Sequence, residues 1–102
     1  MKYAIVDIGS NAIKYKIFNA NLDLVEYYRH PLRLGRDVFS KGYLEDITIQ
    51  DLLALLLEYN KIFNRKKIQN VNYIATSALR DTQNSVETVS YTHLTLPTNI
   101  GV

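Results

Sequence analysis

Residues 3–11 read Tyr3-Ala4-Ile5-Val6-Asp7-Ile8-Gly9-Ser10-Asn11, and they predict a strand followed by a tight turn. Apart from Asp7, its first six residues are apolar at both alternating sets of positions, which is typical of a strand buried on both faces. A carboxylate near the end of such a strand is costly unless it is paired, hydrogen-bonded or bound to a cation. Gly9 allows a ligand to approach the backbone closely, and Ser10 and Asn11 add short hydrogen-bonding side chains. The pattern by itself fits either an anion-binding loop or an ordinary hairpin turn capped by Asp and Asn.

The composition indicates one small globular domain. The chain has 102 residues, of which 47% are hydrophobic, and a net charge of +2 from 12 basic and 10 acidic residues. This balance does not indicate a nucleic-acid surface, and the absence of cysteine excludes disulfides and thiolate chemistry. No signal peptide precedes the first strand, and the longest apolar run, Leu52 to Leu57, is too short to cross a membrane. We therefore expect a soluble, cytoplasmic protein that binds neither nucleic acid nor membrane.

Two further strands follow the first loop. Residues 12–18 alternate between apolar and lysine side chains after Ala12, which predicts a half-exposed strand. Residues 24–34 predict a third strand. Pro31 lies within it and cannot donate to a ladder, so this strand should lie at an edge or end near the proline. Residues 37–46, with Gly42 and mixed charges, predict a loop.

A helix is the most strongly patterned element. Thr48 and Asp51 have the spacing of a capping box. Apolar residues then recur at helical spacing: Ile49, Leu52, Leu53, Leu56, Tyr59, Ile62 and Phe63. Residues 71–75 predict a fourth strand, which a right-handed crossover would place parallel to a strand of the sheet. The predicted fold is therefore α/β: a three-stranded antiparallel meander, a fourth strand beside the first, and one helix across a face. The other face should expose an apolar patch.

Three segments resemble the exopolyphosphatase / guanosine pentaphosphate phosphatase family of the actin-like ATPase superfamily. Asp7-Ile8-Gly9-Ser10-Asn11 is similar to the first phosphate-binding loop of that family. Ala75-Thr76-Ser77-Ala78-Leu79-Arg80-Asp81, with Asn84 following, is similar to its Ala-Thr-x-Ala-x-Arg pattern. Arg33-Leu34-Gly35 matches a family segment after the third strand, although Arg36 stands where an acidic residue is common. The resemblance implies a truncated actin-like ATPase (ribonuclease H-like) domain, β-β-β-α-β, with a second helix starting near residues 84–87.

The resemblance also implies a chemistry. The parent enzyme would be a homodimer that hydrolyses a terminal phosphoanhydride of inorganic polyphosphate or guanosine pentaphosphate. Asp7 would hold Mg²⁺, and the phosphate would be bound by Gly9, Ser10, Asn11, Arg33, Thr76, Ser77 and Arg80. Arg80 offers a planar donor fork for phosphate oxygens, although it could instead pair with Asp81 or another carboxylate. A kinase of the same superfamily that acts on a small molecule is one alternative.

No catalytic residue is assigned. In the family, the catalytic Glu lies in a Ser-Gly-x-Glu-Glu-Ala-Arg-like segment, and a second glycine-rich loop follows it; neither occurs in these 102 residues. The other alternative is therefore a non-catalytic fragment that binds phosphate weakly. Even if the parent protein is a phosphatase, this chain by itself is expected to be inactive.

The last residues differ from the rest of the chain. Residues 88–102 contain no charged residue, four threonines and a break at Pro97. Residues 89–98 resemble a translated sequencing adapter. We expect residues 1–87 to form a partial N-terminal phosphatase domain and residues 88–102 to be a non-native or disordered tail.

Overall fold

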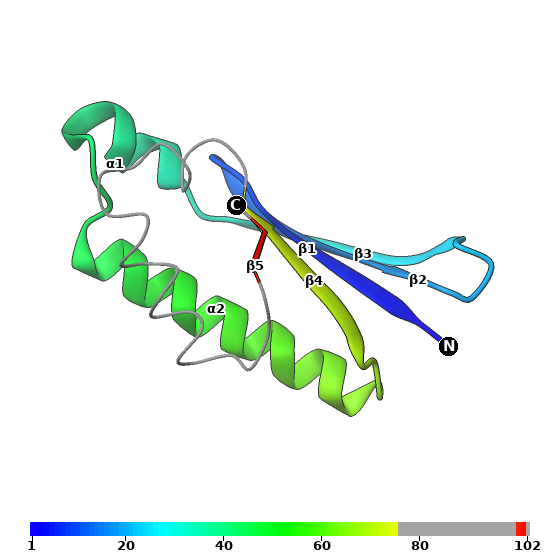
Figure 1. Ribbon diagram of the computed structural model, residues 1–102. Coiled ribbons are helices and arrows are strands. Elements are labelled where there is room, and N and C mark those ends of the chain that lie inside the picture. Colours follow the sequence, from blue (N-terminus) through cyan, green and yellow to red (C-terminus); the bar gives the residue numbers. More distant parts are fainter. Residues whose placement is uncertain (76–99, 102) are drawn as a thin grey trace.

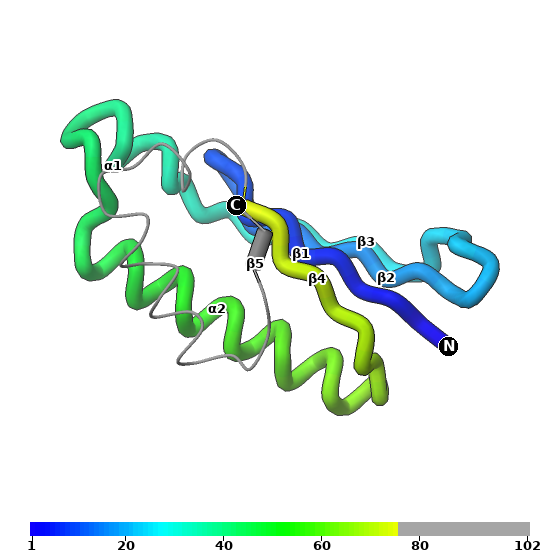
Figure 2. Tube along the Cα trace, in the orientation of Figure 1, coloured from blue at the N-terminus to red at the C-terminus, as the bar shows by residue number. Residues whose placement is uncertain are grey.

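The computed structural model describes residues 1–75, 100 and 101, which form a mixed sheet with a long helix across one face (Figure 1). In chain order the elements are β1 (Tyr3–Ile8), β2 (Ala12–Phe18), β3 (Leu24–Pro31), α1 (Leu34–Lys41), α2 (Asp46–Arg65), β4 (Asn70–Ala75) and β5 (Ile100–Gly101). The strand order in the sheet is β3-β2-β1-β4-β5. The trace in Figure 2 shows the turn between β1 and β2 at the end of the sheet that lies near α1.

The predicted topology is confirmed. β1 pairs antiparallel with β2, and β2 pairs antiparallel with β3. β4 pairs parallel with β1, and Ala75 at its end is the register partner of Ile8. β3 is an edge strand that ends at Pro31, as expected from the missing N–H of proline.

The core lies between α2 and one face of the sheet formed by β1, β2 and β4. In β1, Ala4, Val6 and Ile8 are fully buried, whereas the alternating residues on the other face are half-buried. The apolar side of α2 buries five residues as its spacing predicted: Ile49, Leu52, Leu56, Tyr59 and Phe63. The Tyr59 hydroxyl donates a buried hydrogen bond of 2.7 Å to the carbonyl of Ile13. This bond ties α2 to the first residues of β2.

The prediction of a loop over residues 37–46 is wrong for its first half, because residues 34–41 form helix α1. This helix ends at Gly42, whose backbone is left-handed with φ 79° and whose N–H donates to the Val38 carbonyl at 2.8 Å. This helix has only eight residues, about two turns, and helices of that length are marginal in isolation, so the local sequence does not by itself indicate it.

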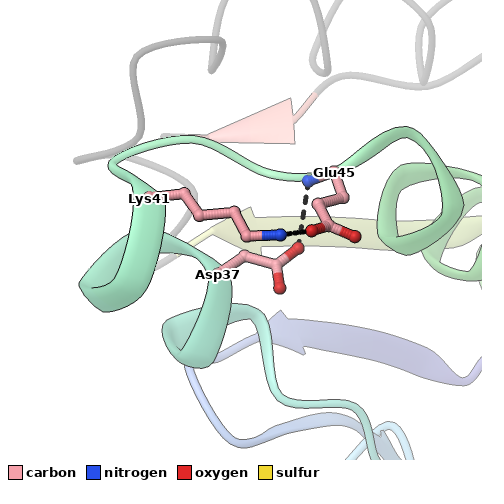
Figure 3. Close-up of polar contacts among 3 residues, drawn as sticks. All are labelled: Asp37, Lys41 and Glu45. Carbon is pink, nitrogen blue, oxygen red and sulfur yellow. Dashed lines mark hydrogen bonds and ion pairs between the residues drawn. The ribbon is translucent and has the colours of Figure 1, made fainter.

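The start of α2 also differs from the prediction. The helix begins at Asp46 after Glu45, which makes no side-chain capping bond, so Thr48 and Asp51 lie inside the helix and form no capping box. Glu45 is positioned from α1 instead: its N–H donates to Asp37 Oδ2 at 3.0 Å, and its carboxylate pairs with Lys41 (Figure 3). A contact across the helix junction therefore sets the start of α2.

The sheet face opposite α2 leaves apolar side chains in contact with solvent. Tyr27 and Ile74 line a groove on this face and are 49% and 44% exposed. Among the described residues, Figure 1 shows no helix over this face of the sheet. This is the exposed apolar face that a single covering helix predicts.

The end of the chain is described at two residues. Ile100 and Gly101 pair parallel with Tyr73 and Ile74 as β5. The predicted second helix lies outside the described residues, and the assignment of residues 88–102 as a non-native tail stays a prediction. In the described part of the chain, neither helix has the length and hydrophobicity that crossing a membrane requires.

Candidate phosphate-binding site

A polar concavity of about 300 Å³ opens where β1 ends and β2 begins. Its lining comes from the first loop, β1, β2 and β3: Asp7, Gly9, Ser10, Asn11, Ala12, Lys14 and Arg29. The structure thus brings together the four predicted site residues of the first loop and adds two cations to them.

Backbone hydrogen bonds within the first loop, and from residues 32 and 35, hold this loop in its conformation. The Gly9 N–H donates to the Ala12 carbonyl at 3.1 Å, which closes the turn. The Leu32 N–H donates to the Asn11 carbonyl at 3.3 Å, and the Gly35 N–H donates to the Ser10 carbonyl at 2.8 Å. The first turn of α1 therefore fixes the loop that lines the concavity.

Gly35 is needed for this close approach. A Cβ at this position would lie 3.3 Å from the Ser10 Cβ and 3.4 Å from the Ser10 carbonyl oxygen, which is tight for a methyl group. The match of Arg33-Leu34-Gly35 to the family segment thus has a structural reason, because Leu34 is fully buried and Gly35 contacts the loop.

Asp7 supplies the carboxylate of the site. Its Oδ1 is buried and has no hydrogen-bond partner among the described residues. A buried carboxylate oxygen without a partner is costly, and a cation would remove that cost. In the described part of the chain, no three His, Cys, Asp or Glu residues form a cluster that could hold a metal by themselves. Mg²⁺ commonly uses one or two carboxylates and completes its shell with water and substrate phosphates, so Asp7 fits this metal.

Lys14 and Arg29 are site residues that the sequence analysis did not identify. Lys14 is the register partner of Asp7 across β1 and β2, and Arg29 is the register partner of Lys14 across β2 and β3. Residues paired in this way share one face of the sheet. The ion pairs seen within the described residues, Lys41–Glu45 and Lys66–Glu26, do not involve either of these two cations. The alternation of residues 12–18 indicates the face of Lys14, but the position of Arg29 depends on the hairpin register.

The other predicted phosphate ligands lie elsewhere or outside the described residues. Arg33 is the N-cap residue of α1, is exposed, and does not line the concavity. Thr76, Ser77 and Arg80 lie outside the described residues. They follow Ala75, which is the last residue of β4 and pairs with Ile8 beside the loop.

A second polar cluster lies on the α2 face of the sheet. The Tyr15 hydroxyl donates to Glu26 Oε2 at 2.5 Å, and Lys66 Nζ lies 3.1 Å from Glu26 Oε1. The hydrogen bond from Tyr15, helped by Lys66, lowers the pKa of Glu26. Burial and the neighbouring carboxylate raise the pKa of Tyr15 to about 12. The cluster connects β2, β3 and the end of α2 and has no lining residue in common with the concavity.

Comparison with known proteins supports a phosphatase relationship. The sequence model of the Ppx/GppA phosphatase family matches residues 14–102. A bifunctional 3-dehydroquinate synthase/phosphatase from Fusobacterium nucleatum is 33% identical over 91 residues, and the match covers 79% of this chain and 14% of that protein.

Solved structures show the same fold. A crystal structure of the Aquifex aeolicus member of the Ppx/GppA family has a TM-score of 0.91 and 26% identity, over 100% of this chain and 34% of that one. An exopolyphosphatase-like protein has a TM-score of 0.87 and 26% identity, over 99% of this chain and 32% of that one. The fold is therefore that of the actin-like domain in these proteins, as predicted. The chain spans about a third of the length of these solved relatives.

Proposed function

The chain belongs to the Ppx/GppA phosphatase family, and on this premise we propose that it carries the first phosphate-binding loop of a phosphoanhydride hydrolase. The proposed substrates are inorganic polyphosphate and guanosine pentaphosphate, whose terminal phosphoryl group would be removed. The observation that carries the proposal is the polar concavity at the end of β1, where Ser10 and Asn11 lie beside a buried carboxylate oxygen of Asp7.

Each residue of the concavity would have a different role in binding the phosphate and Mg²⁺. Ser10 and Asn11 would donate hydrogen bonds to phosphate oxygens, Gly9 would allow the phosphate close to the backbone, and Lys14 would offset its charge. Asp7 would hold Mg²⁺, which when bound neutralises the phosphate oxygens and polarises the phosphoryl group. Thr76, Ser77 and Arg80 remain proposed ligands of the phosphate, and so does Arg33, although Arg33 does not line the concavity itself.

Binding is not sufficient for hydrolysis. A positioned base and an in-line water are needed, and base assistance is typically worth about 10²- to 10⁴-fold. Among the described residues that line the concavity, Asp7 is the one carboxylate, and it is proposed to hold the metal. We therefore expect this chain to bind phosphate compounds weakly in the presence of Mg²⁺ without measurable turnover.

The test combines binding with phosphate release. Binding of tripolyphosphate with and without Mg²⁺ is measured by NMR titration of the purified chain, and release from polyphosphate and guanosine pentaphosphate is measured in parallel. Asp7→Ala should abolish the Mg²⁺-dependent part of binding. The control Asp23→Ala, at an exposed turn between β2 and β3, should leave it unchanged. Absence of binding to the unmodified chain would refute the proposed site. Release that depends on Asp7 would show that the chain is itself an enzyme.

Homodimeric assembly of the parent enzyme and a cytoplasmic location stay predictions. Sedimentation velocity of the full-length protein tests the first, and fractionation of the source cells tests the second.

A further inference from the structure

A row of three charges crosses the sheet beside the first loop. Asp7 on β1, Lys14 on β2 and Arg29 on β3 are successive register partners, and all three line the concavity. Neighbouring strands lie about 4.8 Å apart, so the backbones of Asp7 and Arg29 are separated by roughly 10 Å. A phosphoryl group bound at Asp7 and the loop would have Lys14 as its nearest cation of the row. Arg29 lies one strand farther out.

Among the described residues, a substrate with linked phosphoryl groups could extend from the loop toward either of two neighbouring regions on the sheet face opposite α2. One direction leads into a groove of about 320 Å³, which shares Asp7 and Lys14 with the concavity. That groove is otherwise lined largely by apolar or aromatic side chains, namely Ile5, Phe18, Tyr27 and Ile74, with Lys16 as a further cation. Burying phosphate oxygens against such side chains is unfavourable. In the other direction the lining of the concavity itself continues to Arg29, on the exposed edge strand β3.

We infer that Arg29 is a specificity-determining residue, which binds the phosphoryl group next to the terminal one and so selects compounds with at least two linked phosphoryl groups. Its guanidinium presents a planar pair of donors that fits two oxygens of one phosphoryl group, and no carboxylate of the described residues forms an ion pair with it. The inference rests on the proposed function, because it takes the loop and Asp7 as the terminal-phosphate site.

The experiment compares two inorganic anions on the purified chain. Affinities for orthophosphate and tripolyphosphate are measured with Mg²⁺ by NMR titration, and the amide signals of Gly9 and Gly35 report on the loop. Three variants are compared: Arg29→Gln, Arg29→Lys, and the matched control Arg65→Gln. Arg65 is an exposed cation at the far end of α2, so its replacement makes the same charge change away from the concavity.

Arg29→Gln should weaken tripolyphosphate binding about tenfold and leave orthophosphate binding unchanged. Arg29→Lys should recover part of the loss, because a lysine keeps the charge but not the donor fork. Arg65→Gln should change neither affinity. Equal losses for both anions, or no loss for either, would overturn the inference alone. Failure of the unmodified chain to bind either anion would overturn the proposed function and the inference together.

Discussion

Replacing Gly35 by Ala tests whether the first turn of α1 sets the shape of the phosphate loop. Two effects of the added methyl group oppose each other. Alanine in place of a helical glycine stabilises a helix by about 1 kcal/mol. The new Cβ would meet the Ser10 Cβ at 3.3 Å and the Ser10 carbonyl oxygen at 3.4 Å, and the second of these atoms belongs to stiff backbone. Overpacking of this kind typically costs about 1–3 kcal/mol.

We therefore expect the Gly35→Ala chain to be less stable than the unmodified chain by roughly 1 kcal/mol. Displacement of the loop would also lengthen the 2.8 Å hydrogen bond from Gly35 to Ser10. Binding of tripolyphosphate should then weaken by about tenfold, which corresponds to about 1.4 kcal/mol. Urea unfolding measures the first effect, and the NMR titration measures the second.

Two control variants separate the loop effect from general effects on α1. Ser40→Ala changes an exposed position of the same helix, so it should stabilise slightly and leave binding unchanged. Gly42→Ala places a side chain at φ 79°, so it should cost about 1 kcal/mol through backbone strain, again without an effect on binding. A Gly35→Ala chain that is more stable than the original and binds tripolyphosphate equally well would refute the reasoning.

Three further predictions concern stability. Tyr59→Phe should lower the free energy of unfolding by about 1–2 kcal/mol, because it removes the buried 2.7 Å bond to the Ile13 carbonyl; an unchanged urea midpoint would contradict this. The folded-state pKa of Glu26 is lowered from its ordinary value of 4.5, so its stabilising effect is present above about pH 4.5 and is lost as the pH falls through the lower folded-state value. Glu26→Gln should therefore flatten the acid limb of a stability–pH profile, and a limb of unchanged slope would show that other carboxylates cause it. Truncation after Glu87 should change stability by no more than about 0.5 kcal/mol if residues 88–102 are a foreign tail. A loss of several kcal/mol would instead show that the pairing of Ile100 and Gly101 with β4 is part of the native fold.

The sequence was sufficient for the elements that have strong local patterns. The apolar run of residues 3–8, the lysine alternation of residues 12–18 and the leucine-rich face of residues 49–63 each bury a distinct set of side chains. Such periodicity determines the type of an element because a one-residue shift in a strand would move its apolar side chains into solvent. The loop at Gly9–Asn11 was also predictable, since its small and polar residues interrupt two strands.

Tertiary contacts decided what these local patterns could not. Helix α1 has only eight residues, so its formation depends on contact with the loop through Gly35 and on the turn at Gly42. The start of α2 likewise depends on α1, because Asp37 of α1 accepts the hydrogen bond from the N–H of Glu45.

For the candidate site, the sequence was enough to predict Asp7 and the small polar residues that follow it. The structure added Arg29, which is 22 residues from Asp7 in sequence (29 − 7) and joins the concavity through the registers of two strand pairs. It also explained Gly35, whose missing side chain allows α1 to touch Ser10. A sequence pattern indicates which face of a single element is buried. Which charged residues share a site depends on the register between strands, and that register is fixed when the apolar face of the whole sheet is buried in the core.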